Sequence, residues 1–299
     1  MVSLLLHLAI FQGIAGFERA PRFRIERVRA LTGADFLLAD LNNRGQFTGS
    51  YYDSTGMKSF IYNSQKLTII PPLPGCTHMM AQAINDSGVA VGYGNYRRYP
   101  GEDIAFIFEG GKTRPLEAND QLSSYAHGIA NSGLIVGFMQ TKGAVVWKDG
   151  HRQELPGPKE DTFAYGANEN GDISGASGNN PIVWHAVLGK GEMWHSFERQ
   201  PKKEFPTLAG FPLNRIFDTN KSQVSLGQCT GNNPDRSRAA LWSHNKVHDL
   251  NSLVQPDKSW LLEKAYCIND KGTVLGSGLY KGKKTPFLLQ PITRQLNGK

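Results

Sequence analysis

The sequence predicts an all-β fold: a six-bladed β-propeller with four antiparallel strands in each blade. Three observations predict it. A hairpin motif occurs six times, a fixed step of residues recurs later in the repeats, and each repeat has room for four short strands. The motif is clearest at 83–93, AINDSGVAVGY, and at 267–277, CINDKGTVLGS.

Each motif is an apolar strand, a polar turn and a second strand that closes on a glycine. The motifs occupy 41–50, 84–93, 129–138, 167–176, 219–228 and 268–277. Their closing glycines are Gly49, Gly92, Gly137, Gly175, Gly227 and Gly276, spaced 43, 45, 38, 52 and 49 residues apart. Asn or Asp begins such a turn by bonding its own backbone, and glycine supplies the positive φ that completes it. We therefore interpret Asn42, Asn85, Asn168 and Asn269 as turn residues and not as a ring of ligands.

A short apolar third strand follows each hairpin, at 59–62, 105–108, 144–147, 181–184, 239–242 and 286–289. A fourth strand is expected at 66–73, 112–117, 151–157, 205–210 and 246–253. Eight residues separate Tyr62 from Ile70, and the same step recurs from Phe108, Trp147 and Trp242. We expect the bulky third-strand residues, Trp184 included, to form core between blades, because large apolar side chains are usually buried.

Closure of the ring requires a fourth strand for the last blade. Residues 22–30 precede the first hairpin at the spacing of a fourth strand, so we predict that they complete the blade built from 268–289. The segment 291–296 competes for this place, but Pro291 makes it the weaker candidate.

These units resemble the HAF-repeat family, a group of predicted extracellular bacterial repeats. The shared pattern is Ile-Asn-x-x-Gly, then Val-x-Gly, then Ala-Phe and an aromatic residue, best matched by 83–93 with 105–108. The unit at 267–289 has Pro286 for the alanine, and the unit at 219–242 departs most, with Ser222 and Gln223 in its turn. The resemblance covers roughly 22–290. It implies a propeller-like fold and a secreted or envelope location, but no reaction.

The N-terminus favours the same location. Residues 4–15 are mostly apolar and too short to span a bilayer, which is typical of a secretory signal. We therefore divide the chain into a leader at 1–20 and one propeller domain at 21–299. The alternative is a buried N-terminal segment or a misplaced start codon, which would leave a cytoplasmic protein.

Composition narrows the classes of partner. The net charge of +7 is spread along the chain, which favours anionic partners but is too diffuse to indicate nucleic acid. Cys76, Cys229 and Cys267 have no CxxC spacing, so we expect isolated buried thiols. We expect a monomer with no membrane span, no cofactor and no metal site.

Loop lengths predict where a ligand binds. Turns between strands 1–2 and 3–4 are tight, whereas the loops between strands 2–3 and between blades are long, and binding residues concentrate on long loops. On that face, aromatic and basic side chains alternate in two loops. The candidate ligand-binding residues are Tyr96, Arg97, Arg98, Tyr99, Tyr280, Lys281, Lys283 and Lys284.

The fourth blade carries an insertion, since Leu208 lies 24 residues after Trp184 where other blades use eight. An extended hairpin is the simpler interpretation. The alternative is an interaction arm, because long insertions are often functional, with Trp194, His195, Lys202 and Lys203 as its contacts.

Catalytic signatures are absent from the sequence, which has no HExxH, GxSxG, P-loop or dinucleotide fingerprint. Acids on the long-loop face, such as Asp103 and Asp235, keep hydrolysis open. The sequence therefore favours a non-catalytic extracytoplasmic module that binds an anionic glycan or an envelope protein. The alternative is a propeller hydrolase or lyase acting on a glycan.

Overall fold

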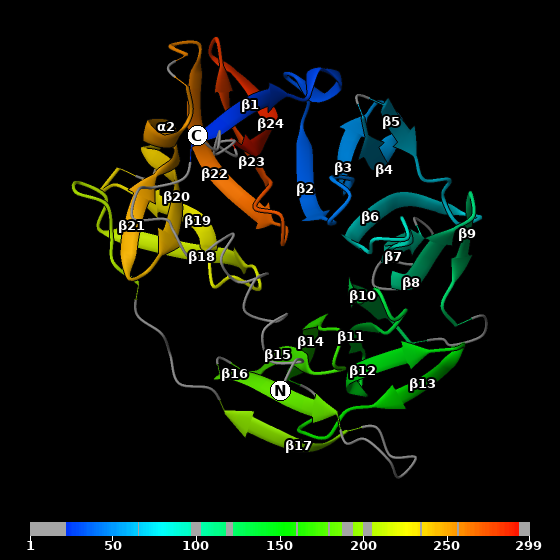
Figure 1. Cartoon of the computed structure of the whole chain (residues 1–299). Coiled ribbons are helices and arrows are strands. Elements are labelled where there is room, and N and C mark those ends of the chain that lie inside the picture. Colours follow the sequence, from blue (N-terminus) through cyan, green and yellow to red (C-terminus); the bar gives the residue numbers. More distant parts are fainter. Residues whose placement is uncertain are drawn as a thin grey trace, which may run out of the picture.

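The computed structural model describes residues 22–64, 66–96, 103–117, 122–159, 161–178, 180–186, 194–199, 205–233, 235–255 and 257–292. The proposed leader at 1–20 lies outside this part of the chain. The described fold is all-β and propeller-like: small antiparallel sheets follow one another around a common centre, with the first strand of each nearest the middle (Figure 1).

Each sequence repeat forms one four-stranded unit. Unit 1 is β2 (Phe36–Leu41), β3 (Phe47–Asp53), β4 (Gly56–Asn63) and β5 (Lys66–Ile69). Unit 2 is β6 (Cys76–Ile84), β7 (Ala90–Tyr96), β8 (Asp103–Glu109) and β9 (Lys112–Pro115). Unit 3 is β10 (Ser124–Ile129), β11 (Ile135–Met139), β12 (Gly143–Lys148) and β13 (His151–Glu154).

The later repeats follow the same order. Unit 4 is β14 (Thr162–Ala167), β15 (Ile173–Ser177), β16 (Asn180–Ala186) and β17 (Trp194–Arg199). Unit 5 is β18 (Leu213–Thr219), β19 (Ser225–Thr230), β20 (Ser237–Ser243) and β21 (Lys246–Asp249). Unit 6 is β22 (Trp260–Ile268), β23 (Val274–Tyr280) and β24 (Lys283–Pro291), completed by β1 (Phe23–Arg27). A 3-10 turn, η1 (Arg29–Leu31), and one helical turn, α2 (Leu250–Leu253), complete the described elements.

The first and last described strands pair in unit 6. Strand β1 pairs antiparallel with β24, with Ile25 opposite Leu289, so the predicted fourth strand from 22–30 is confirmed. Units 1 and 2 form a single eight-stranded sheet, because Met57 of β4 and His78 of β6 make one parallel pair. The other units are separate four-stranded sheets.

Unit 4 corrects the sequence-based prediction of its fourth strand. That strand is β17 at 194–199 and not 205–210, since Phe197 lies opposite Trp184 in the β16–β17 ladder. The backbone of Trp194 and His195 therefore belongs to the outer strand of a sheet and not to a separate arm. Lys202 and Lys203 lie outside the described residues. The prediction failed because it placed the fourth strand at Leu208 and passed over the nearer aromatic segment WHSFER, which forms the strand.

Most of the bulky third-strand residues form core between units, as predicted. Tyr62, Phe108, Trp147, Trp184 and Trp242 are all buried. The three indoles also donate hydrogen bonds to the segment that precedes their unit: Trp147 to the Glu117 carboxylate, Trp184 to the Pro156 carbonyl and Trp242 to the Pro206 carbonyl. Each tryptophan therefore anchors the segment that leads into its unit. Trp147 and Trp184 also pack against the preceding unit, whereas Trp242 departs from the prediction, because its cluster holds residues of unit 5 and its own connecting segment.

The repeated closing glycine is explained by the inner strands. Every first strand carries a bulge three residues before the turn position, as at His127 and Tyr165. The second strand then passes so close that a Cβ at Gly137 or Gly227 would overlap a first-strand carbonyl oxygen. Glycine is needed here for space, because any side chain would push the bulged inner strand out of its ladder.

The turn asparagines do what the sequence predicts, and they also join units. In Asn42 the Oδ1 atom accepts the amides of Arg44 and Gln46, which closes the turn. Its Nδ2 donates 2.8 Å across to the Asn85 carbonyl of unit 2. The same inter-unit bond runs from Asn85 to Ala130, from Asn220 to Asn269 and from Asn269 to Asn42. These amides are buried and fully bonded, so they are structural.

A second row of hydrogen bonds lies beside the first. The backbone amide of the residue after each asparagine position donates to the side-chain oxygen of its counterpart in the next unit. The bonds run Lys221 to Asp270, Asp270 to Asn43, Asn43 to Asp86, Asp86 to Asn131 and Asn131 to Glu169. Both rows run from unit 5 through units 6, 1 and 2 to unit 3, and the second row alone continues to unit 4.

Candidate functional site

The two loops predicted to bind a ligand lie on different units. Tyr96 ends β7 of unit 2, and Arg97, Arg98 and Tyr99 lie outside the described residues. Tyr280, Lys281, Lys283 and Lys284 form the β23–β24 hairpin of unit 6. Unit 1 stands between units 2 and 6, so the described residues do not show the two loops lining one site.

The prediction of a long loop between strands 2 and 3 is wrong for unit 6, because residues 278–285 continue the β23–β24 ladder up to a tight turn. This turn carries three lysines. Tyr280 pairs with Lys283, and Lys281 and Gly282 between them both have positive φ, 50° and 76°. The Lys281 amide donates to the Ser259 carbonyl at 2.8 Å, which holds the turn against the start of β22. Lys281, Lys283 and Lys284 are exposed, so their side chains face solvent at the turn between strands 2 and 3 of unit 6.

Aromatic rings support these cations. The Arg27 guanidinium lies 4.4 Å from the centroid of the Tyr280 ring, and the Lys281 ammonium lies 5.6 Å from the same centroid. Trp260 packs against Tyr280 at 5.1 Å between centroids, and Lys284 lies 4.9 Å over Phe36. A cation over a ring face is attracted by the ring quadrupole, which orients both groups. We call Arg27, Trp260, Tyr280, Lys281, Lys283 and Lys284 the cationic surface.

Sequence reasoning found four of these six residues. Arg27 and Trp260 were missed because they come from β1 and β22, far from the hairpin in sequence. Their only signal was the prediction that 22–30 joins the last blade, which places Arg27 beside β24 but does not say that it reaches Tyr280.

One acid moderates the charge of this surface. Burial raises the pKa of Glu263 on β22, although Lys264, Arg238 and Lys284 act to lower it. Its carboxylate is therefore partly neutralised from three sides.

A second cluster lies on the inner strands of units 2, 3 and 4. Tyr93, Tyr125, Phe138 and Phe163 form a row of ring contacts, with centroid distances of 4.9 Å for Tyr93–Tyr125 and 4.6 Å for Phe138–Phe163. The bulged His127 lies 5.7 Å from Tyr165, whose side chain is 52% exposed. This inner aromatic row offers ring faces and few charges.

The titratable groups in that row are poorly suited to proton transfer at neutral pH. Desolvation lowers the pKa of His127 to about 4, so its imidazole is neutral. Burial, and then the hydrogen bond to Asp103, raise the pKa of Tyr125 far above its ordinary value. Asp103 accepts from the Tyr125 hydroxyl at 2.6 Å and from Asn95 at 2.9 Å, so its oxygens are already engaged. A general acid or base works best with a pKa near the working pH.

Three further expectations can be compared with the structure. Cys76, Cys229 and Cys267 are buried and form no disulfide with one another, as predicted. Within the described ranges, no group of three or more His, Cys, Asp or Glu is placed to hold a metal ion. In the same part of the chain, no helix has the length and apolar character needed to cross a membrane.

Comparison with known proteins gives matches to solved structures alone. No family model and no curated protein matches the chain. A protein assigned as TolB from Agrobacterium tumefaciens matches 92% of this chain and 100% of its own, with 12% identity and a TM-score of 0.43. A protein assigned as a gluconolactonase matches 95% and 97%, with 9% identity and a TM-score of 0.46. The major allergen Mala s 1 of Malassezia sympodialis matches 90% and 97%, with 9% identity and a TM-score of 0.41. At these identities and scores, function must be argued from this chain's own residues.

Proposed function

We propose that the protein is a non-catalytic, extracytoplasmic binding module whose ligand is an anionic glycan. The cationic surface carries this proposal. Three exposed lysines and one arginine are gathered around a Trp–Tyr pair, and such a surface suits a polymer that alternates carboxylates with sugar rings.

The scaffold we propose for it is a closed six-bladed propeller, with unit 6 as the blade that joins the two ends of the chain. Pairing of β1 with β24 supports closure, because it ties the first strand of the chain into the last sheet. The resemblance of the repeat to the HAF-repeat family supports secretion. N-terminal sequencing of the native protein tests this, and an intact Met1 in a cytoplasmic fraction would contradict it.

The binding test uses the full chain and immobilised polygalacturonate, with uncharged dextran as the reference polymer. We expect retention on polygalacturonate that falls with rising salt, because exposed charges are screened. The double substitution Lys281→Ala with Lys283→Ala should weaken binding about tenfold, which corresponds to roughly 0.7 kcal/mol per lysine.

A matched control removes the same charge from the opposite face. Lys66 and Lys112 are exposed residues that follow tight turns in units 1 and 2. Lys66→Ala with Lys112→Ala should leave retention unchanged. Equal loss in both double variants would show that binding follows net charge alone, and release of shortened sugars during the assay would favour a hydrolase or lyase.

A further inference from the structure

Unit 5 breaks the turn pattern of the repeat in a specific way. The third residue after the turn asparagine position is a glycine with positive φ in every other unit, for example Gly88 at 79° and Gly272 at 79°. In unit 5 it is Gln223, which keeps the same conformation at φ 60°. Left-handed backbone is unfavourable for a residue with a Cβ, so this glutamine is held there at a cost in stability.

The second turn of unit 5 shows the same exchange. Units 2 and 3 place a glycine at the end of the turn between strands 3 and 4, Gly111 at φ 80° and Gly150 at φ 79°. Unit 5 has Asn245 there, at φ 58°, preceded by His244 at φ 49°. Unit 5 therefore has an amide residue at both turn positions, whereas unit 1 has one, Gln65, at the second position and keeps Gly45 at the first.

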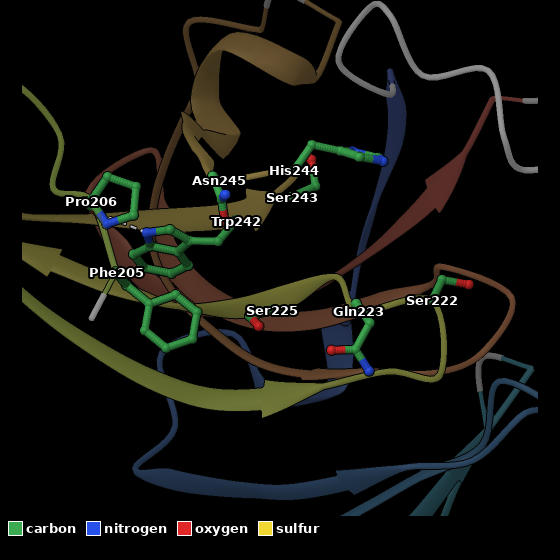
Figure 2. Close-up of a pocket in the computed structure, with 9 residues that line it drawn as sticks. All are labelled: Phe205, Pro206, Ser222, Gln223, Ser225, Trp242, Ser243, His244 and Asn245. Atoms are coloured by element: carbon green, nitrogen blue, oxygen red, sulfur yellow. Dashed lines mark hydrogen bonds between the residues drawn. The ribbon is translucent and has the colours of Figure 1, made fainter. Parts of the chain in front are cut away.

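These strained residues all line one pocket. Gln223, His244 and Asn245 surround a cavity of about 230 Å3, together with the rings of Phe205 and Trp242 (Figure 2). The rings stand nearly perpendicular, with centroids 6.0 Å apart, and the bond from Trp242 to the Pro206 carbonyl fixes the indole. Ser225 is buried and lies between the rings and Gln223.

The equivalent pocket of unit 3 shows what has changed. It has a volume of about 370 Å3 and contains Gly133, Gly150 and Ile135 at the positions of Gln223, Asn245 and Ser225. The tryptophan is common to both, as Trp147 and Trp242. Unit 5 thus keeps the aromatic wall of the repeat and replaces a glycine–isoleucine lining with two amides and a hydroxyl.

The chemistry of the lining defines the ligand. Among the described residues the lining includes no Asp, Glu, Lys or Arg, and His244 is its one titratable side chain. Amides and hydroxyls both donate and accept, which suits a ligand with several hydroxyls, and an aromatic wall suits an apolar ring face. We infer that this pocket binds one neutral hexose unit of a glycan. The cavity is smaller than a typical drug-sized site, which is about 300–1,000 Å3, so one ring fits better than a longer oligosaccharide.

This inference is independent of the cationic surface. The pocket lies at the turns between strands 1–2 and 3–4 of unit 5 and takes an uncharged ligand, whereas the cationic surface lies at the turn between strands 2 and 3 of unit 6. The test is saturation-transfer NMR of the full chain with the methyl glycosides of glucose, galactose, mannose and N-acetylglucosamine. We expect transfer to at least one of them, with a dissociation constant on the order of 1 mM for so small a ligand.

The decisive variant restores the repeat: Gln223→Gly with Asn245→Gly. It should weaken sugar binding at least tenfold while the melting temperature stays equal or rises, since glycine relieves the left-handed strain. Ser64→Gly is the matched control, because Ser64 has φ 46° in the corresponding turn of unit 1 and is remote from the pocket. It should leave sugar binding unchanged.

Two results would overturn the inference. One is the absence of transfer to all four glycosides in a folded protein. The other is undiminished transfer in the Gln223→Gly, Asn245→Gly protein, which would place any sugar site elsewhere.

Discussion

The joints between units differ, and the clearest contrast is between the joint of units 1 and 2 and the joint of units 4 and 5. At the first, Asn42 donates to Asn85, and Asn43 donates to Asp86. A third bond runs from the Ile84 amide to Asp40. These bonds satisfy polar groups of both units at once, so the joint is fixed by geometry as well as by apolar contact.

The residues at the same positions in units 4 and 5 do not make these bonds with one another. Asn168 donates to Asp172 within its own turn, and its side chain is exposed. Gly166 occupies the place of Asp40 and has no side chain. Lys221 occupies the place of Asp86 and has no acceptor oxygen. Leu213 of β18 is also 62% exposed, unlike the buried Cys76 that begins β6.

The outer part of this joint is nevertheless conventional. Trp242 donates to the Pro206 carbonyl, as Trp184 does to Pro156 at the joint of units 3 and 4. The Trp242 bond therefore anchors the segment that leads into unit 5. Among the described residues no extended contact joins a strand of unit 4 to a strand of unit 5, so the two inner rows do not continue across this joint. The difference teaches that the repeat encodes two separable contacts, an outer tryptophan anchor and an inner hydrogen-bond network.

The largest expected effect comes from breaking the network where it is complete. Asn42→Ala removes one inter-unit bond and three turn bonds and leaves the Asn85 carbonyl without this donor, so it should lower the free energy of unfolding by about 3–4 kcal/mol. Asn168→Ala removes bonds within an exposed turn and should cost about 1 kcal/mol. Urea denaturation of both variants measures the difference, and equal losses would contradict the contrast.

Two titratable groups, Asp40 beside the hydrogen-bond network and His127 in the inner aromatic row, should give opposite pH dependences of stability. Burial raises the pKa of Asp40 to about 6 from an ordinary 3.8, so the folded state binds its proton more tightly. Its contribution is present below pH 4 and is lost as pH rises to 6. Relative to wild type, Asp40→Asn should therefore gain up to about 2–3 kcal/mol between pH 4 and 6.

His127 should act in the opposite direction over nearly the same window. Desolvation lowers its pKa from 6.5 to about 4, so the unfolded state binds the proton more tightly. Its contribution is present above pH 6.5 and is lost as pH falls to 4. Relative to wild type, His127→Phe should lose up to about 2–3 kcal/mol as pH rises from 4 to 6.5. Urea midpoints at pH 4, 5, 6 and 7 provide the measurement, and variant curves parallel to wild type would contradict both assignments.

Much of the fold could be predicted because residues close together in the sequence determine it. The turn residues, the third strands and the buried aromatic set follow from spacing, and the β1–β24 pairing follows from counting strands. The fourth strand of unit 4 could not be found by spacing, since nothing in the step from Trp184 distinguishes Phe197 from Leu208. The inner network and the ring stack around Tyr280 were also out of reach, because each bond joins residues dozens to hundreds of positions apart.

The smallest expected effect comes from adding the missing acceptor. Asn43 and Asn131 show that asparagine serves at this position, so Lys221→Asn supplies an oxygen for the amide of Glu169. It also removes the exposed ion pair between Lys221 and Asp270, which is worth little. We expect stability to rise by about 0.5–1 kcal/mol and the Glu169 amide to exchange its hydrogen several-fold more slowly. Lys221→Ala, which removes the same ion pair without adding an acceptor, is the control. Equal exchange rates in the two variants would show that the sheets of units 4 and 5 do not approach as units 1 and 2 do, and that the contrast lies in backbone position and not in this one side chain.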